Sequence, residues 1–127
     1  MKYTKSTDYA LHVVAYIIEA EDEGNISVQK LASKMDASTT FLSKILTQLT
    51  KAGIIRSTSG KNGGYCLQKK KEDISFLDVI KAVEGSGYMH TPPVCRSESC
   101  RIQDIMREAE GKMLAYLESR KIYEVFS

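Results

Sequence analysis

Residues 36–67 read DASTTFLSKILTQLTKAGIIRSTSGKNGGYCL, and this stretch predicts a short turn, a helix and two strands. Ser38 can cap the first turn of the helix, and Gly53 can supply the left-handed residue that ends it. At about 100° per residue, one side of the helix is apolar and is formed by Leu42, Ile45, Leu46 and Leu49. The opposite side carries hydroxyls and lysines, namely Thr40, Ser43, Lys44, Thr47 and Lys51. We therefore expect one face in a core and the other facing water or an anionic partner.

A hairpin is predicted directly after this helix. Ile54 and Ile55 favour one strand, Tyr65 and Leu67 favour a second, and the segment 59–64, SGKNGG, predicts a flexible turn with a cationic tip. A winged helix presents such a pair to DNA, with the helix in the major groove and the wing at a phosphate or in the minor groove. An ordinary helix and hairpin with a solvated lysine face would give the same pattern.

The distribution of charge favours nucleic acid as the partner. The chain has 18 basic and 16 acidic residues, so its net charge is only +2. The segment 30–71, however, contains nine basic residues and one acid, a net charge of +8, which leaves −6 for the remainder. Charge gathered on the predicted helix and hairpin is expected of a surface that contacts phosphates and binds DNA in a salt-dependent manner.

Length and composition predict an ordinary globular domain without a membrane partner. The 127 residues, 43% of them hydrophobic, suffice for one modest core. No apolar run approaches the roughly 20 residues that span a bilayer, and the first residues do not resemble a signal peptide, so we expect a cytoplasmic protein. Three cysteines in such a chain argue against a disulfide framework, and leave open a role in thiol chemistry or metal binding.

The fold class predicted for the whole chain is mainly α with a small β-hairpin wing. A first helix is expected over residues 4–23, with Thr7 as its cap or in its early turn. Ser27 can cap a second helix that runs to about Lys34, and a turn of about three residues separates it from the helix of the opening stretch. This spacing is typical of a helix-turn-helix, and we assign a winged helix-turn-helix domain to residues 1–85.

The last third of the chain is predicted to hold a loop and a long helix. Ser75 and Asp78 form a capping pair for a short helix that Gly85 ends. Residues 86–100 show no helical or strand period and contain Cys95 and Cys100, so we expect a sensor loop there. Residues 101–127 are predicted to form a dimerisation helix and tail, because apolar residues recur at heptad spacing: Ile102, Met106, Ala109, Met113 and Tyr116.

A two-fold dimer would use this heptad stripe and would present two DNA-binding heads about one helical turn apart on a palindromic operator. The other explanation of the stripe is a helix that packs on its own domain. We favour the dimer, since the first helix is too short to cover so long a stripe.

The residues also resemble a known family. The run TDYALH, the segment KAGII followed by SG and GGY, and the run ISFLDVIKAVEG with cysteines soon after are similar to the Rrf2-type bacterial winged-helix regulators. That family includes the iron-sulfur regulator IscR, the nitric-oxide sensor NsrR and the cysteine regulator CymR, and the similarity covers nearly the whole chain. The resemblance implies a homodimeric transcription regulator with a long crossing C-terminal helix.

The resemblance also implies which residues contact DNA. Positions that match the recognition-helix contacts of relatives are Thr39, Thr40, Phe41 and Ser43, and we add Lys44 from the polar face of the helix. Matching wing contacts are Ser59, Gly60, Lys61, Asn62 and Gly63.

The resemblance suggests a 2Fe-2S cluster as the sensor, on an incomplete set of ligands. Relatives with a cluster usually place three cysteines in the matching loop, whereas this chain has only Cys95 and Cys100 there, and Cys66 lies on the predicted wing. Some relatives add an acidic residue from the first helix of the other subunit, which matches Asp8, and one kind uses a histidine, which matches His12. These two positions are four residues apart, so one helical face presents both, and imidazole ligands can hold such a cluster beside thiolates.

Other mechanisms of regulation stay open at this point. Cys95 and Cys100 could act as a thiol switch without a cluster, or they could be inert while a small ligand or a partner protein regulates the chain. A thiol oxidoreductase would usually carry a Cys-x-x-Cys motif at a helix start, and this sequence has none. No set of nucleophile, base and oxyanion donors is recognisable either, so we do not expect an enzyme.

Overall fold

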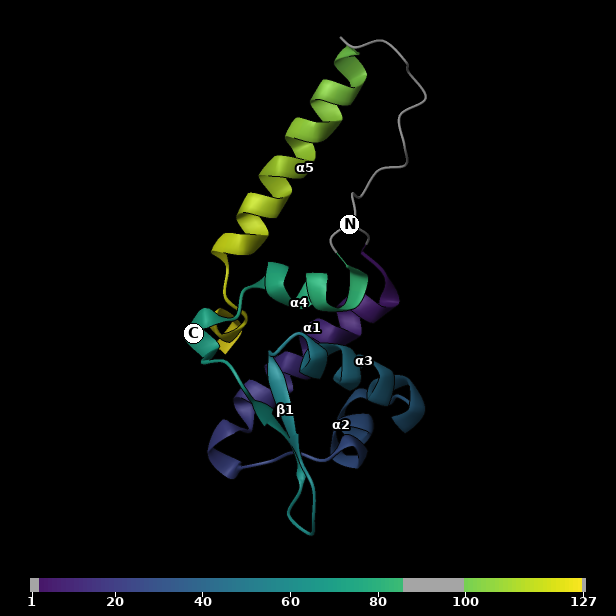
Figure 1. Cartoon of the computed structure of the whole chain (residues 1–127), viewed down its shortest axis with the longest axis vertical. Helices are drawn as coiled ribbons and strands as arrows, with labels where there is room; N and C mark the ends of the chain where they lie inside the picture. The colour runs from purple at the N-terminus through teal and green to yellow at the C-terminus, as the bar shows by residue number, and fades with distance from the viewer. Residues whose placement is uncertain (1–2, 86–99, 127) are drawn as a thin grey trace.

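The computed structural model describes residues 3–85 and 100–126, and within them the predicted order of elements is confirmed (Figure 1). Three helices are followed by a two-stranded antiparallel hairpin, a fourth helix and a long fifth helix, so the fold class is mainly α with a β-hairpin wing. The main elements are α1 (Lys5–Glu19), α2 (Val28–Met35), α3 (Thr39–Lys51), β1 (Ile55–Thr58), β2 (Gly64–Leu67), α4 (Phe76–Glu84) and α5 (Arg101–Ser119). Short 3-10 turns are η1 (Glu21–Glu23), η2 (Lys71–Asp73) and η3 (Ile122–Phe126).

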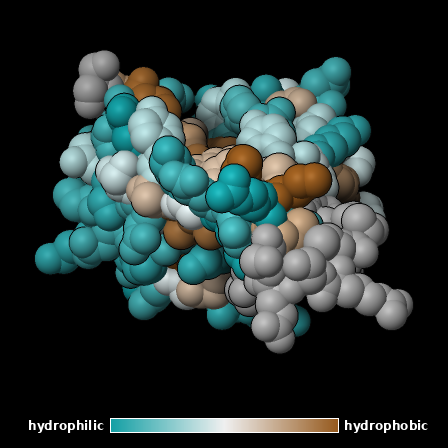
Figure 2. Space-filling model, turned by 90° about the horizontal axis from the view of Figure 1, so that it is seen from above, coloured by the Kyte–Doolittle hydropathy of each residue, from teal (hydrophilic) through white to brown (hydrophobic). Residues whose placement is uncertain are grey.

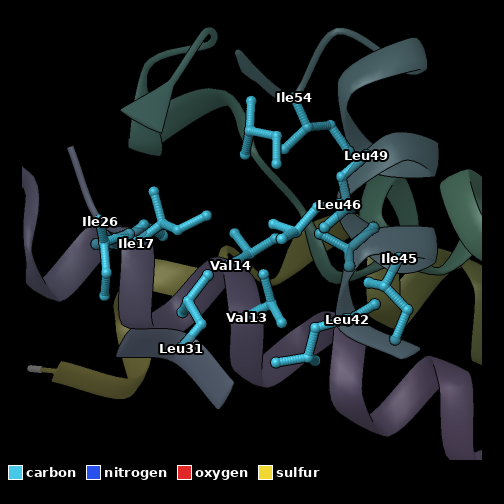
Figure 3. Packing of buried hydrophobic residues seen from close by; sticks show 14 of the residues in the cluster. Val13, Val14, Ile17, Ile26, Leu31, Leu42, Ile45, Leu46, Leu49 and Ile54 are labelled. Atoms are coloured by element: carbon cyan, nitrogen blue, oxygen red, sulfur yellow. The ribbon is translucent and has the colours of Figure 1, made fainter. Parts of the chain in front are cut away.

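The core is built around α1, which is contacted by α2, α3, α4, the wing and the C-terminal turn. Its side chains Val13, Val14 and Ile17 meet Leu31 of α2 and residues of α3 (Figure 3). The predicted apolar side of α3 is confirmed, since all four of its side chains are buried: Leu42, Ile45, Leu46 and Leu49. Both helices therefore fold because apolar residues repeat at the helical period and find a shared interior.

The predicted helix ends are largely confirmed. The hydroxyl of Ser27 accepts from the amide of Lys30, and that of Ser38 accepts from the amide of Phe41, both at 3.1 Å. Ser75 and Asp78 cap each other reciprocally at 3.0 Å, as the sequence predicted. Each cap supplies a partner for amides that have none within their helix.

The first helix begins as predicted, at Thr4 with Thr7 in its early turn, but the prediction was wrong at its carboxyl end. Its cap is Thr4, whose hydroxyl accepts from the amide of Thr7 in the first turn, so Thr7 is the reciprocal partner and not the cap itself. The α-helix stops at Glu19, and residues 21–23 form a 3-10 turn. Three consecutive acids at a helix carboxyl end oppose the helix dipole, which favours an early end to α1.

The wing is held to the body by a third extended segment. Ile55 pairs with Leu67 and Thr58 with Gly64, so the first strand begins one residue later than predicted. Ile26, which lies between α1 and α2, exchanges two main-chain hydrogen bonds with Tyr65 of β2, at 3.0 and 2.8 Å. The hairpin thus gains an additional partner near the turn end of β2, and it projects from the helices (Figure 1).

Helix α5 begins far from the other helices, and its carboxyl end lies beside them (Figure 1). Leu114 and Leu117 pack against Leu77 and Ile80 of α4. After α5 ends, Ile122 is buried in the same core as α1, so the tail packs into the domain predicted for residues 1–85. The division at residues 85 and 100 stays a prediction.

Replacing Gly64 with Ala is expected to lower the free energy of unfolding by about 2–3 kcal/mol. A Cβ there would lie 2.6 Å from the main-chain oxygen of Ile26, and the residue has φ of +146°, which an L side chain rarely adopts. Gly111→Ala is the matched control: nothing lies near its added methyl group, so this variant should gain about 0.5–1 kcal/mol as a helical Ala. Urea unfolding measures both changes, and equal effects of the two variants would contradict the packing of β2 on Ile26.

Candidate nucleic-acid interface and sensor residues

The open face of α3 carries the polar side chains that the sequence assigned to DNA. Thr39, Thr40, Ser43 and Lys44 are all exposed, while the buried side of the helix fixes its orientation on α1. Thr47 lies on the same open face, and its hydroxyl donates to the main-chain oxygen of Ser43 at 2.8 Å. The helix therefore presents a row of small donors and acceptors with the ammonium groups of Lys44 and Lys51, a chemistry suited to base edges and phosphates.

Phe41 differs from its neighbours, because its ring is half-buried against the body of the domain. The ring meets that of Tyr9 edge to face, with centroids 5.1 Å apart and planes at 86°. The ammonium nitrogen of Lys5 lies 5.6 Å from the centroid of Tyr9 and 5.8 Å from that of Phe41. This contact joins the recognition helix to α1, and the linear sequence offers no signal for it because its partners lie on separate helices.

The tip of the wing forms a tight turn that exposes a lysine. The amide of Gly63 donates to the main-chain oxygen of Gly60 at 3.0 Å, which places Lys61 and Asn62 at the centre of the turn. Gly60 has φ of +103°, a backbone conformation that favours glycine. Lys61 and Ser59 are exposed, so the predicted cationic tip is formed as a local structure.

Asp8 and His12 lie on the exposed side of α1 and touch each other. The nitrogen His12 Nδ1 is 2.8 Å from the main-chain oxygen of Asp8 and 3.5 Å from a carboxylate oxygen of that residue. A carbonyl oxygen can only accept, so Nδ1 donates in this contact and Nε2 is the ring nitrogen left to face a ligand. More than half of each side chain is exposed, so both remain accessible to a ligand.

Two open clefts meet at Asp8 and His12, each of about 300 Å³. One is polar and lies between α1 and the end of α2, and it is completed by Tyr9, Tyr16, Lys34 and Met35. The other is mainly apolar and reaches the C-terminal turn, with Tyr3, Leu11, Ala15, Phe76, Ile122 and Val125 in its walls. The two predicted α1 ligands thus stand at the rim of an apolar groove that sequence reasoning did not foresee.

Among the described residues, no cysteine joins Asp8 and His12 in a metal site. Cys95 lies outside the described residues, and Cys100 is the half-buried residue that precedes α5. Cys66 is half-buried on β2, where the Nε of Arg56 donates to its sulfur at 3.2 Å. Among residues 3–85 and 100–126, no three histidine, cysteine or acidic side chains gather into a metal site. The described residues of one protomer therefore do not hold a cluster by themselves.

The stripe predicted for dimerisation is open along most of α5. Ile102 and Met106 are 72% and 46% exposed, and Ile105, which the heptad pattern did not select, is 64% exposed. Tyr116 is also exposed, whereas Met113 is half-buried. Apolar patches interrupt the hydrophilic surface seen from the end of the molecule at which α5 begins (Figure 2). A different face of α5, formed by Leu114 and Leu117, packs against α4 of the same chain.

Comparison with known proteins identifies the family. Residues 3–127 match the family model Rrf2, described as an iron-dependent transcriptional regulator. The chain belongs to the Rrf2 family. The resemblance found in the sequence is therefore confirmed, and the fold is the one seen in the solved structures described below.

Individual relatives agree with this assignment. Over 87 residues, 68% of its length, the chain is 37% identical to the putative HTH-type transcriptional regulator YffB of Lactococcus lactis, of which this match spans 56%. The CymR structure from B. subtilis, named the global cysteine regulator of that organism, has a TM-score of 0.87 at 22% identity, covering 98% of this chain and 95% of that one. The T. potens IscR structure has a TM-score of 0.83 at 19% identity, covering 99% and 86%. The oxidised form of CymR from Staphylococcus aureus has a TM-score of 0.79 at 26% identity, covering 98% and 95%.

Within the part of the chain that the structure describes, no helix combines the length and apolar character needed to cross a membrane.

Proposed function

We propose that this Rrf2-family regulator is a cytoplasmic homodimer that binds a palindromic operator through α3 and the wing. The observation that carries the proposal is that the segment of net charge +8 folds into an open polar helix face and an exposed lysine turn. Thr40, Ser43 and Lys44 would lie in the major groove, and Lys61 with the glycine tip would reach a phosphate or the minor groove. The other predicted contacts would flank these, at Thr39, Phe41, Ser59, Gly60, Asn62 and Gly63.

The open stripe of α5 supports the dimer. Ile102, Ile105 and Met106 would remain in water in a single protomer, although one helix face rarely exposes so much apolar surface without a partner. A second copy placed by a two-fold axis would cover the stripe with the same stripe, including Ala109, Met113 and Tyr116. Rrf2 regulators are generally dimeric, which agrees with this arrangement.

For the signal, we favour a 2Fe-2S cluster shared between the two protomers. Asp8 and His12 of one copy would supply oxygen and nitrogen ligands, and Cys95 and Cys100 of the other copy would supply thiolates. The described residues support only the α1 half of this set, through the open pair and the free Nε2 of His12. Such a cluster would add one-electron redox chemistry, and the imidazole ligand would raise its potential relative to an all-thiolate site.

A thiol switch without a cluster is the second candidate. The similarity to a CymR captured in an oxidised form favours it, as does the small number of cysteines in the predicted sensor loop. Regulation by a small ligand or a partner protein would replace both mechanisms without changing the proposed DNA contacts.

Two substitutions distinguish backbone contacts from base contacts. Lys61→Ala is expected to weaken binding to all DNA duplexes and to reduce the slope of log K against log salt by about 0.9 for each wing. Thr40→Ala is expected to keep the salt slope and to lose about 1–3 kcal/mol of discrimination at one position of the operator. Fluorescence titrations on an operator selected from random duplexes measure both, and binding by the unmodified protein that ignores ionic strength would contradict the DNA-binding proposal.

Met106→Asp is expected to dissociate the dimer while the protomer stays folded. An unpaired charge on the proposed interface costs about 3–5 kcal/mol, which raises the dissociation constant more than about a hundredfold. Arg107→Asp is the matched control, since this neighbouring exposed residue lies off the heptad stripe. Analytical ultracentrifugation gives the mass of each variant, and an unchanged dimer in Met106→Asp would place the interface elsewhere.

Protein purified without oxygen is expected to show visible absorption bands and about two irons per subunit. Asp8→Ala and His12→Ala should then lower the iron content or shift the spectrum, whereas Asp22→Ala, an exposed acid of η1, should change neither. A colourless protein that reconstitution with iron and sulfide cannot fill would exclude the cluster and leave the thiol switch or a ligand as the signal.

A further inference from the structure

We infer that Asn25 is a positioning residue for the wing, which it holds in the orientation that brings Lys61 to DNA. The inference rests on the proposed function, because it concerns how the same surface meets the operator. Asn25 lies in the linker between η1 and α2, far in sequence from the hairpin, and no motif singled it out.

The contact is a single hydrogen bond to the centre of the wing turn. The amide nitrogen Nδ2 of Asn25 donates to the main-chain oxygen of Asn62 at 3.0 Å. Asn62 and Lys61 are the two central residues of that turn, which is closed by the bond between Gly63 and Gly60. The tether therefore holds the carbonyl group of the residue that follows the lysine proposed to reach the phosphate.

The linker is itself anchored, so it can serve as a fixed point. The next residue, Ile26, is buried in the core and exchanges two main-chain hydrogen bonds with Tyr65. Gly64 packs so closely on Ile26 that a Cβ there would meet its main-chain oxygen at 2.6 Å. Strand β2 is thus fixed to Ile26 close to the turn, and Asn25 extends this attachment to the tip.

A second attachment matters because a two-stranded hairpin is by itself a weakly ordered structure. If the tip moves freely, Lys61 loses conformational entropy each time it binds a phosphate, and the affinity falls. An asparagine in an exposed linker has no packing role that Ala could not fill, since Asn25 makes no contribution to the buried core. Its amide is therefore best explained by the bond to the wing.

The test is a double-mutant cycle between Asn25→Ala and Lys61→Ala on the selected operator duplex. Asn25→Ala alone is expected to weaken binding about three- to tenfold, the value of one hydrogen bond that orders the tip. In the Lys61→Ala background the same change should cost less than about twofold, because the group that the tether positions is gone. Amide hydrogen exchange over residues 57–65 should become faster in Asn25→Ala at an unchanged melting temperature.

Glu23→Gln provides the matched control at the exposed end of η1, two residues before Asn25, and it should neither weaken binding nor alter exchange at the tip. The positioning role would be overturned if Asn25→Ala weakened binding equally in the Lys61→Ala background. It would also be overturned if Asn25→Ala did not weaken binding of an otherwise wild-type protein that binds DNA. Equal losses in Glu23→Gln would also overturn it. If the wild-type protein binds neither the selected duplex nor mixed-sequence DNA, the proposed function itself fails, and faster exchange in Asn25→Ala would still report the tether as a structural contact only.

Discussion

The burial of α1 is the constraint on which the rest of this structure depends. Its residues Val13, Val14 and Ile17 are almost fully removed from water, and they contact side chains from the helix-turn-helix, the wing and the carboxyl end. One helix thus supplies much of the interior surface on which the other elements pack. The same helix has a single exposed stripe, which carries Asp8 and His12. A ligand held by that stripe would therefore act on the element that positions the recognition helix.

Two further contacts join this central helix to functional surfaces. At its start, Thr4 and Thr7 donate their hydroxyls to the carboxylate of Glu84 at the end of α4, with the bond from Thr7 measuring 2.8 Å. On its side, Tyr9 packs edge to face on Phe41 of α3. The helix that carries Asp8 and His12 is consequently in direct contact with the helix assigned to DNA binding.

Much of the fold could be predicted because it follows from patterns of neighbouring residues in the sequence. Serine caps, the period of Leu42 to Leu49 and the glycine-rich turn each depend on neighbours within a few residues, and the structure confirms them. The misses involve contacts between distant segments. No periodic pattern in the sequence predicts the hydrogen bonds from Ile26 to Tyr65 and from Asn25 to Asn62, or the burial of Ile122 in the core. The end of α1 was placed too late because apolar periodicity does not register the repulsion between three acids and a helix carboxyl end.

The way in which α5 is attached limits how a signal could alter DNA binding. Its last turns are held by Leu114 and Leu117 on α4, and the chain then continues through a main-chain bond from Phe76 to Arg120 into the buried Ile122. A helix fixed at two successive points cannot rotate independently of the domain that holds it. Any change in how two copies of α5 cross would then carry each DNA-binding head with it as a rigid body. Regulation through the dimer would therefore alter the spacing of the heads, while each recognition helix keeps its own packing on α1.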